Sequence, residues 1–179
     1  MRIVAGDWRG RAIKAPPGET TRPTADRTRE TLFNMLSSRL GSFEGLSAVD
    51  LFAGSGALGL EALSRGCASC LFVEEDKRAV DAIRANVAAL GAGTRATVQQ
   101  ASALRLGPAK VPHDLVMLDP PYGTGAGAVA LERLVRRWAQ RWGQVYVICG
   151  GFFYDPAEED PTRADGKIFH WQVGQVAVP

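Results

Sequence analysis

The most constraining feature of this sequence is the stretch of residues 49–60, which reads VDLFAGSGALGL. A short apolar run carries one acid, Asp50, and ends in three glycines, Gly54, Gly56 and Gly59. A helical pattern follows directly, so the stretch predicts a strand, a tight turn and the start of a helix. Glycines in such a turn permit a sharp bend, close approach of a ligand and close packing of helix on strand. The N–H groups at the helix start then face whatever occupies the turn.

The glycine spacing matches GxGxxG, and Glu74 supplies the acid about 20 residues further on that can bind a ribose. Two ligands fit this pattern, a nicotinamide dinucleotide and S-adenosylmethionine (SAM). An acid inside the strand, Asp50, crowds an incoming pyrophosphate but can meet the amino group and sulfonium of SAM. The stretch alone leaves both ligands open, as well as an ordinary turn without a ligand.

Strand and helix patterns alternate along most of the chain. This alternation predicts an α/β fold with a mostly parallel sheet, in which ligands bind at the carboxyl ends of the strands. The expected strands cover residues 46–52, 70–74, 95–99, 113–118, 144–149, 167–171 and 173–178, the last two as a hairpin turned at Gly174. The expected helices cover residues 25–40, with Thr24 as N-cap, and residues 57–65, 76–90 and 126–141.

A second motif, Asp119, Pro120, Pro121 and Tyr122, follows the expected strand at residues 113–118. Prolines fix the backbone and lack N–H groups, so their carbonyls and the Asp119 carboxylate present only acceptors. Such acceptors can hold both hydrogens of an exocyclic base amine and stabilise the positive charge that develops as its nitrogen attacks. Tyr122 can stack on the base, which must be unpaired or flipped to enter. The alternative is a mere turn after a buried strand.

Positive charge is concentrated near the N-terminus. Residues 1–39 hold eight Lys and Arg but only four Asp and Glu, although the formal charge of the whole chain is +2. This asymmetry favours a polyanionic partner, with a solvated basic face as the alternative.

Two short alternating segments, residues 2–5 and 11–15, predict a hairpin at the start of the chain. Its loop region carries Trp8, Arg9 and Arg11. Trp8 either stacks on a base while the arginines hold phosphates, or packs onto the domain.

The chain has 179 residues, enough for one domain with one core. No apolar run approaches the roughly 20 residues of a membrane span and no signal peptide is recognisable, so we expect a cytoplasmic protein. Cys67 and Cys70 form a CxxC pair that leads into an apolar run. Because two further ligands at zinc spacing are missing, we expect core packing for this pair and no metal site.

Four segments resemble the RsmD family of bacterial methyltransferases: residues 2–11, 22–34, 50–65 and 119–122. That family methylates the exocyclic amine of a guanine in small-subunit (16S) ribosomal RNA, using SAM. The resemblance covers nearly the whole chain and implies a Rossmann-like class I methyltransferase with a seven-stranded sheet. It further implies a single domain, with an N-terminal extension for RNA at residues 1–44 and a SAM-binding core at residues 45–179. We expect a monomer.

Position by position, the resemblance implies three sets of site residues. The SAM-binding set is Asp50, Phe52, Ala53, Gly54, Ser55, Gly56, Glu74 and Ser102. The catalytic set, which would hold the guanine, is Asp119, Pro120 and Tyr122. The RNA-binding set is Arg9, Arg11, Arg22, Thr24 and Arg27. The sequence departs from the family pattern at Ala101-Ser102, beside the expected adenine, and at Cys149-Gly150-Gly151, where an acid is common.

Three other functions remain as alternatives. An adenine-N6 methyltransferase shares the Asp-Pro-Pro-Tyr motif, but no separate domain for reading a DNA sequence is recognisable, so we expect no DNA partner. A nicotinamide dehydrogenase leaves that motif without a role. A non-catalytic RNA-binding or assembly module predicts RNA binding that is indifferent to Asp119→Ala.

Overall fold

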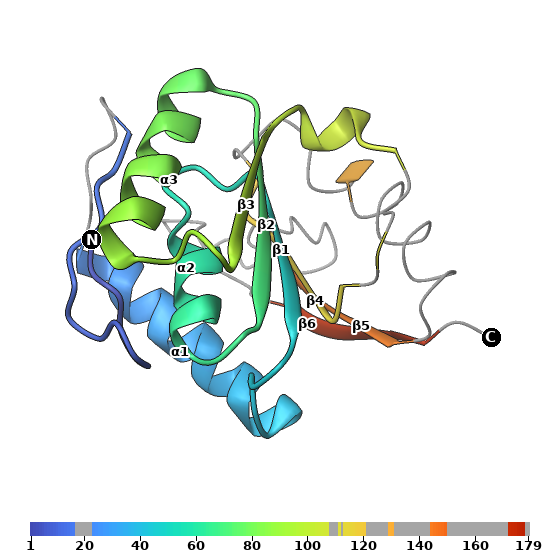
Figure 1. The fold of residues 1–179 in the computed structure, drawn as a ribbon. Coiled ribbons are helices and arrows are strands. Elements are labelled where there is room, and N and C mark those ends of the chain that lie inside the picture. Colours follow the sequence, from blue (N-terminus) through green and yellow to red (C-terminus); the bar gives the residue numbers. More distant parts are fainter. Residues whose placement is uncertain are drawn as a thin grey trace, which may run out of the picture.

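The computed structural model describes residues 1–16, 23–107, 111, 113–120, 129–130, 144–149 and 172–177. Within these residues one six-stranded sheet has the order β3-β2-β1-β4-β5-β6 (Figure 1). The strands are β1 (Ser47–Leu51), β2 (Ser69–Glu74), β3 (Ala96–Gln100), β4 (Leu115–Leu118), β5 (Gln144–Cys149) and β6 (Gln172–Ala177). All pairings are parallel except that of β5 with β6. The predicted Rossmann-like α/β fold is confirmed, while the described residues hold six of the seven expected strands.

The predicted hairpin turn at Gly174 is wrong. Gly174 lies inside β6, where it pairs with Val147 of β5, and the strand continues beyond it to Ala177. A glycine weakens a strand but does not by itself reverse the chain, and here the antiparallel ladder with β5 keeps it extended. Residues 167–171, the other half of the expected hairpin, lie outside the described residues, as does most of the expected helix at 126–141.

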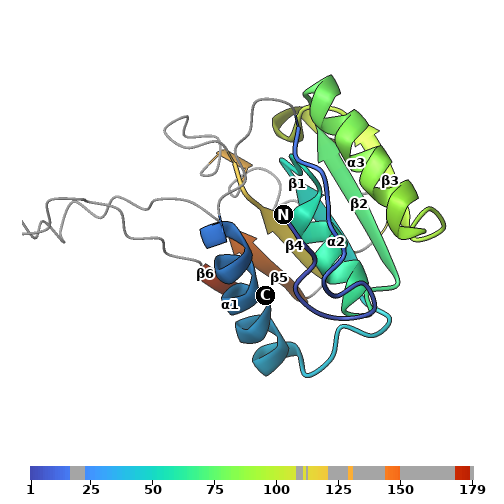
Figure 2. The same cartoon turned by 90° about the vertical axis from the view of Figure 1, so that its left-hand side faces the viewer.

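Three α-helices lie on one face of the sheet, as Figures 1 and 2 show: α1 (Pro23–Leu40), α2 (Ala57–Ser64) and α3 (Lys77–Leu90). Helix α1 starts at Pro23, because proline suits the first helical position, so Thr24 is a helical residue and not the predicted N-cap. Asp76 caps α3 by accepting from two N–H groups of its first turn, and Gly91 ends that helix with a φ of 70°. None of the described helices is long and apolar enough to cross a membrane.

The side chains of the central strands alternate between two apolar clusters. Ala48 and Met117 belong to the first cluster, on the side of the helices, whereas Val49 and Leu118 belong to the second. Both faces of β1 and β4 are therefore buried, which explains why these strands read as nearly continuous apolar runs. Asp50 is the one acid in this pattern, on the face of Ala48.

The N-terminal segment, residues 1–16, runs along α2 and back. Its two arms are antiparallel and exchange backbone hydrogen bonds, for example from the N–H of Ile3 to the carbonyl of Arg11, but only Arg2 and Ala12 form a β-bridge, so a hairpin of two strands is not confirmed. The first arm approaches α2 so closely that a Cβ on Gly6 would lie 1.8 Å from the carbonyl oxygen of Ser64. Gly6 also has a φ of 78°, so only glycine fits here.

Gly59 determines how closely α2 packs on β2. A Cβ at this position would lie 2.3 Å from Cε1 of Phe72 and 2.8 Å from Sγ of Cys70, both in β2. Both separations are far shorter than a carbon atom tolerates, so the helix can approach the strand only with glycine here. This is the packing role that the glycine pattern predicts.

We predict that Gly59→Ala lowers the free energy of unfolding by about 1–3 kcal/mol, because overpacking outweighs the gain in helix propensity. Gly93→Ala is the matched control, since nothing lies within 4 Å of a Cβ built on Gly93. Urea unfolding of both variants measures the difference. Equal stability of the two variants would contradict the packing role of Gly59.

Candidate functional site

Strands β1 and β4 end side by side at the centre of the sheet. Leu51, the last residue of β1, pairs with Leu118, the last residue of β4, so Phe52 and Asp119 begin two neighbouring loops. The strand order also changes direction here, since the chain builds outward from β1 to β3 on one side and through β4 to β5 on the other. Open α/β sheets bind ligands at such a switch point. The glycine turn and Asp119 thus share one edge of the sheet.

The turn after β1 adopts left-handed backbone at three positions, Phe52 (φ 63°), Gly54 (φ 53°) and Gly56 (φ 78°). This conformation is ordinary for glycine but strained for a bulky side chain. Phe52 is held in it while its ring packs against the second apolar cluster. Strain of this kind is typical of functional loops, where the surrounding structure maintains it.

The turn is fixed to the end of β2 but is open on its outer side. The N–H of Ala53 donates to the carbonyl of Val73, and the N–H of Gly54 donates to Oε2 of Glu74 at 2.8 Å. The N–H of Gly56 closes the turn on the carbonyl of Ala53. Nothing lies within 4 Å of a Cβ built on Gly54, so a ligand can approach the backbone there.

Asp50 lies beneath the turn with only 1% of its surface exposed. Its Oδ2 accepts a hydrogen bond from the N–H of Gly59, but its Oδ1 has no partner among the described residues. Burial, and secondarily the charges of Asp119 and Glu74, raise the pKa of this carboxyl well above its usual value, against the opposing effect of the Gly59 bond. A buried acid with an unsatisfied oxygen is destabilising, and such groups are found more often at functional sites than elsewhere in a protein.

Glu74 ends β2 and is half-buried. Its Oε1 accepts hydrogen bonds from the N–H groups of the next two residues, and its Oε2 accepts from Gly54. Because each carboxylate oxygen has two lone pairs, Oε2 retains the capacity to accept a further donor. The carboxylate is therefore positioned at the turn and is available to a hydroxyl group bound there.

The other predicted residues at this edge are described less completely. Ser102 lies between β3 and η1, a short 3-10 helix (Ala103–Arg105). It is the N-cap residue of η1, but its side chain makes no capping hydrogen bond. Asp119 is exposed at the end of β4, whereas Pro120 is buried. Outside the described parts are Arg22, Tyr122 and the side chain of Thr24.

The predicted RNA-binding arginines are spread over the molecule. Arg9 is exposed in the loop that contacts Ser64 at the end of α2, at the sheet edge opposite the glycine turn. The guanidinium of Arg11 donates to the carbonyl of Ala89 in the last turn of α3, where a helix favours positive charge. Arg27 is exposed in the second turn of α1.

Trp8 packs onto the domain, which decides between the two alternatives for this residue. Its side chain is only 8% exposed. The guanidinium of Arg95 lies 4.9 Å from the centroid of the indole ring, which is a cation–π contact. The backbone N–H of Trp8 donates to Oγ of Ser64. Its ring is thus not available for stacking on a base.

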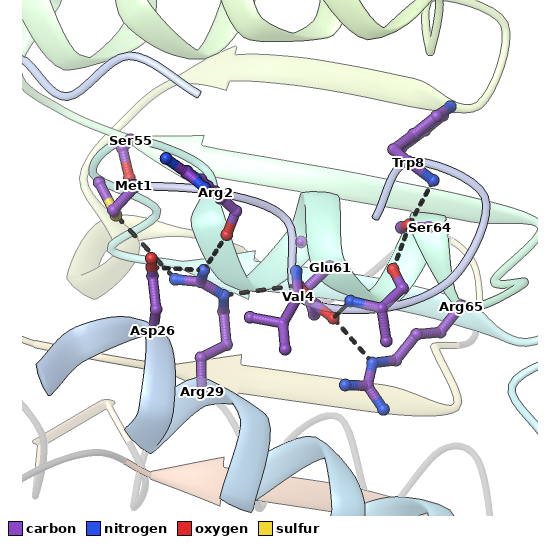
Figure 3. A network of polar contacts seen from close by, with 12 residues as sticks. Met1, Arg2, Val4, Trp8, Asp26, Arg29, Ser55, Glu61, Ser64 and Arg65 are labelled. Atoms are coloured by element: carbon purple, nitrogen blue, oxygen red, sulfur yellow. Dashed lines mark hydrogen bonds and ion pairs between the residues drawn. The ribbon is translucent and has the colours of Figure 1, made fainter. Parts of the chain in front are cut away.

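A buried ionic cluster ties the N-terminal segment to α1 and α2 (Figure 3). Glu61, fully buried in α2, accepts hydrogen bonds from the N–H groups of Val4 and Ala5. Its carboxylate also pairs with Arg65 at 2.9 Å and with Arg29 at 3.5 Å. Loss of any one partner would leave a buried charge incompletely compensated, so the cluster fixes the segment in one place.

Asn86, 2% exposed on α3, makes a second tie. It accepts from the N–H of Lys14 at 2.8 Å and donates to the carbonyls of Lys14 and Ser55 at 2.9 and 3.0 Å. Neither Glu61 nor Asn86 is among the residues predicted from the sequence. The available signals were an amide interrupting the apolar stripe of α3, and a Glu four residues before Arg65.

The CxxC pair is structural. Cys67 and Cys70 are buried in the first apolar cluster, which confirms the predicted core packing. Burial raises the pKa of the Cys67 thiol to about 12, so little reactive thiolate is present at neutral pH. Among the described residues there is no group of three or more His, Cys, Asp and Glu that could hold a metal ion.

Comparison with known proteins gives consistent matches. The model of the family described as "Conserved hypothetical protein 95" matches residues 1–149. Two similar proteins are named ribosomal RNA small subunit methyltransferase D. The one from Escherichia coli K12 is 42% identical over 125 residues, which cover 70% of this chain and 62% of that protein. The one from Haemophilus influenzae is 39% identical over 152 residues, which cover 82% and 77%. This chain thus spans less than two thirds of the Escherichia coli relative.

A solved structure, "Putative methyltransferase yhhF from Escherichia coli", matches with a TM-score of 0.74 and 36% identity, over 86% of this chain and 82% of that one. The family match includes the glycine turn, the N-terminal segment and Asp119. The chain therefore belongs to the Conserved hypothetical protein 95 family, which is the RsmD methyltransferase family that its motifs resemble.

Proposed function

We propose that this protein is a SAM-dependent methyltransferase that modifies the N2 amine of a specific guanine in 16S ribosomal RNA. The observation that carries the proposal is the meeting of the glycine turn after β1 with Asp119 after β4 at one sheet edge. A methyl donor and a base amine must meet in line, and two adjacent loops at a switch point supply the two halves of such a site. The names of the relatives support ribosomal RNA as substrate.

The turn fits SAM better than a dinucleotide. The carboxylates of Asp50, Glu74 and Asp119 lie close enough that the last two raise the pKa of the first. Such an acidic edge attracts the ammonium and sulfonium of SAM and repels a pyrophosphate. The proposed SAM-binding set is Asp50, Phe52, Ala53, Gly54, Ser55, Gly56, Glu74 and Ser102. In it Glu74 accepts from the ribose hydroxyls, the open space at Gly54 admits the ligand, and Ser102 borders the adenine.

When bound, SAM supplies a methyl group that its sulfonium makes electrophilic. Asp119 and the carbonyl of Pro120 accept the two hydrogens of the guanine amine, which orients the nitrogen and stabilises its developing positive charge. Tyr122 stacks on the flipped base. The exposure of Asp119 at the end of β4, beside the turn, supports this role.

The enzyme acts, in this proposal, as a cytoplasmic monomer on the small ribosomal subunit or its assembly intermediate. The basic composition of residues 1–39 supports an RNA partner. Arg22 and Thr24 border the active site, and Arg27 contributes to RNA binding. The division into an extension at residues 1–44 and a core at residues 45–179 is part of the same proposal.

The proposed reaction is tested by incubating the protein with isotope-labelled SAM and unmodified small-subunit particles or their RNA. Digestion and mass spectrometry then identify the methylated nucleoside. We expect N2-methylguanosine. N6-methyladenosine would overturn the guanine assignment, and the absence of any methylated product would contradict the proposed activity.

We predict that Asp119→Ala lowers kcat at least about a hundredfold, because the developing charge on nitrogen loses its acceptor, while the Kd for SAM is unchanged. Asp114→Ala is the matched control. Asp114 precedes the same strand at the opposite edge, where it accepts hydrogen bonds from Ser47. Full turnover by the Asp119 variant would show that this carboxylate is not catalytic.

We predict that Asp50→Asn stabilises the ligand-free protein by about 1 kcal/mol at neutral pH but weakens SAM binding. The raised pKa means that protonation of folded Asp50 contributes stability that is fully present below the ordinary aspartate pKa and is lost as pH rises through the raised value. The difference in unfolding free energy between Asp50→Asn and the wild-type protein therefore grows with rising pH, because Asn does not titrate. Thermal unfolding from pH 4 to 8 and calorimetric SAM titration measure both effects; a destabilised variant with unchanged SAM affinity would be the opposite result.

A further inference from the structure

The loop of the N-terminal segment lies far from the proposed active site. The N–H groups of Asp7 and Trp8 donate to Ser64, the last residue of α2. The ring of Trp8 meets Arg95, which directly precedes β3. Both contacts are at the sheet edge where the parallel strands begin, so Arg9 is on the side opposite the glycine turn.

The two arms of the same segment begin and end near Met1 and Lys14, and this open end of the segment lies at the glycine turn. Sδ of Met1 accepts from Oγ of Ser55 at 3.8 Å, and Asn86 links Lys14 to the carbonyl of Ser55. Figure 3 shows Met1, Arg2 and Ser55 together at one end of α2 and Trp8 at the other. The eight residues of α2 separate these two ends by about 12 Å.

Two cations are exposed at this open end, Arg2 and Lys14. In the part of the chain that the structure describes, neither forms an ion pair. Their backbones are nevertheless fixed: the carbonyl of Arg2 accepts from buried Arg29, and Lys14 is bonded through both its N–H and its carbonyl to Asn86. Pre-positioned cations without an acidic partner are typical of phosphate-binding sites.

The charge of the edge itself makes such cations necessary. Asp50, Glu74 and Asp119 suit a cationic cofactor and a base amine but repel the phosphates of an RNA strand. RNA can deliver a base to Asp119 only if its backbone is held beside this acidic centre by positive charge.

We propose, on the basis of the function above, that Arg2 and Lys14 hold the RNA phosphates next to the target guanine, and that Asn86 is the positioning residue for Lys14. The RNA backbone crosses the open end of the N-terminal segment beside the glycine turn, and not the loop at Arg9. The proposal removes Arg9 from the RNA-binding set predicted from the sequence, and it adds Arg2 and Lys14 to that set.

The test compares three single-charge removals in one segment, Arg2→Gln, Lys14→Gln and Arg9→Gln, with Arg84→Gln, at an exposed position of α3, as the control. The RNA is the particle or RNA preparation that the wild-type enzyme methylates. We expect each of the first two to raise the KM for RNA several-fold and to reduce the slope of log Kd against log salt by about 0.7–0.9. The kcat and the Kd for SAM of these two variants stay at wild-type values, as do all constants of the Arg84→Gln control. Arg9→Gln raises the KM for RNA less than either of them.

Asn86→Ala tests the positioning role. If Asn86 acts through Lys14, the double variant binds RNA about as weakly as Lys14→Gln alone, whereas independent effects would multiply. Wild-type salt slopes for Arg2→Gln and Lys14→Gln, or a larger loss for Arg9→Gln, would overturn the proposal while leaving the methyltransferase activity intact. Failure of the wild-type protein to methylate any RNA would instead refute the function on which the proposal rests.

Discussion

The parallel pairing of β1 with β4 is the constraint on which the candidate site depends. It brings together two chain segments 67 residues apart, Leu51 and Leu118, so that the loops after them open on the same edge. The glycine turn alone is a nucleotide-binding feature of many folds, and the Asp119 motif alone is an exposed acid after a strand. Only their adjacency supplies the two halves of the proposed methyl-transfer site.

Around that adjacency the protein maintains several locally unfavourable features. Phe52 has left-handed backbone, Asp50 is buried with an oxygen that has no partner among the described residues, and the charges of Asp119 and Glu74 help to raise the pKa of Asp50. None of these features contributes to stability, and features of this kind are concentrated at functional sites. The compensation comes from the apolar clusters on both faces of the sheet and from the Gly59 contact that presses α2 onto β2.

Most of the fold was predictable because its signals are local. The glycine turn, the amphipathic helix at residues 76–90 and the apolar strands are all encoded within a few residues, and the parallel sheet follows from their alternation. The features that were missed depend on residues distant in sequence. Glu61 binds Val4 and Asn86 binds Lys14, and no pattern near either residue identifies its partner.

The same reason explains the errors at two other positions. The extended conformation of Gly174 depends on pairing with the distant strand β5, so the local sequence wrongly predicted a turn there. The position of Trp8 could not be decided from the sequence, because its partner, Arg95, lies in a different part of the chain. Local composition predicted a basic N-terminal extension but not which of its two ends lies beside the glycine turn.

A crystal structure with S-adenosylhomocysteine, the demethylated product of SAM, is the most direct test of the account. We predict that its ribose hydroxyls donate to Glu74, that its backbone contacts are with residues 52–56, and that its sulfur faces Asp119. Binding elsewhere, or binding at the turn with the sulfur directed away from Asp119, would contradict the claim that these two loops form one methyl-transfer site.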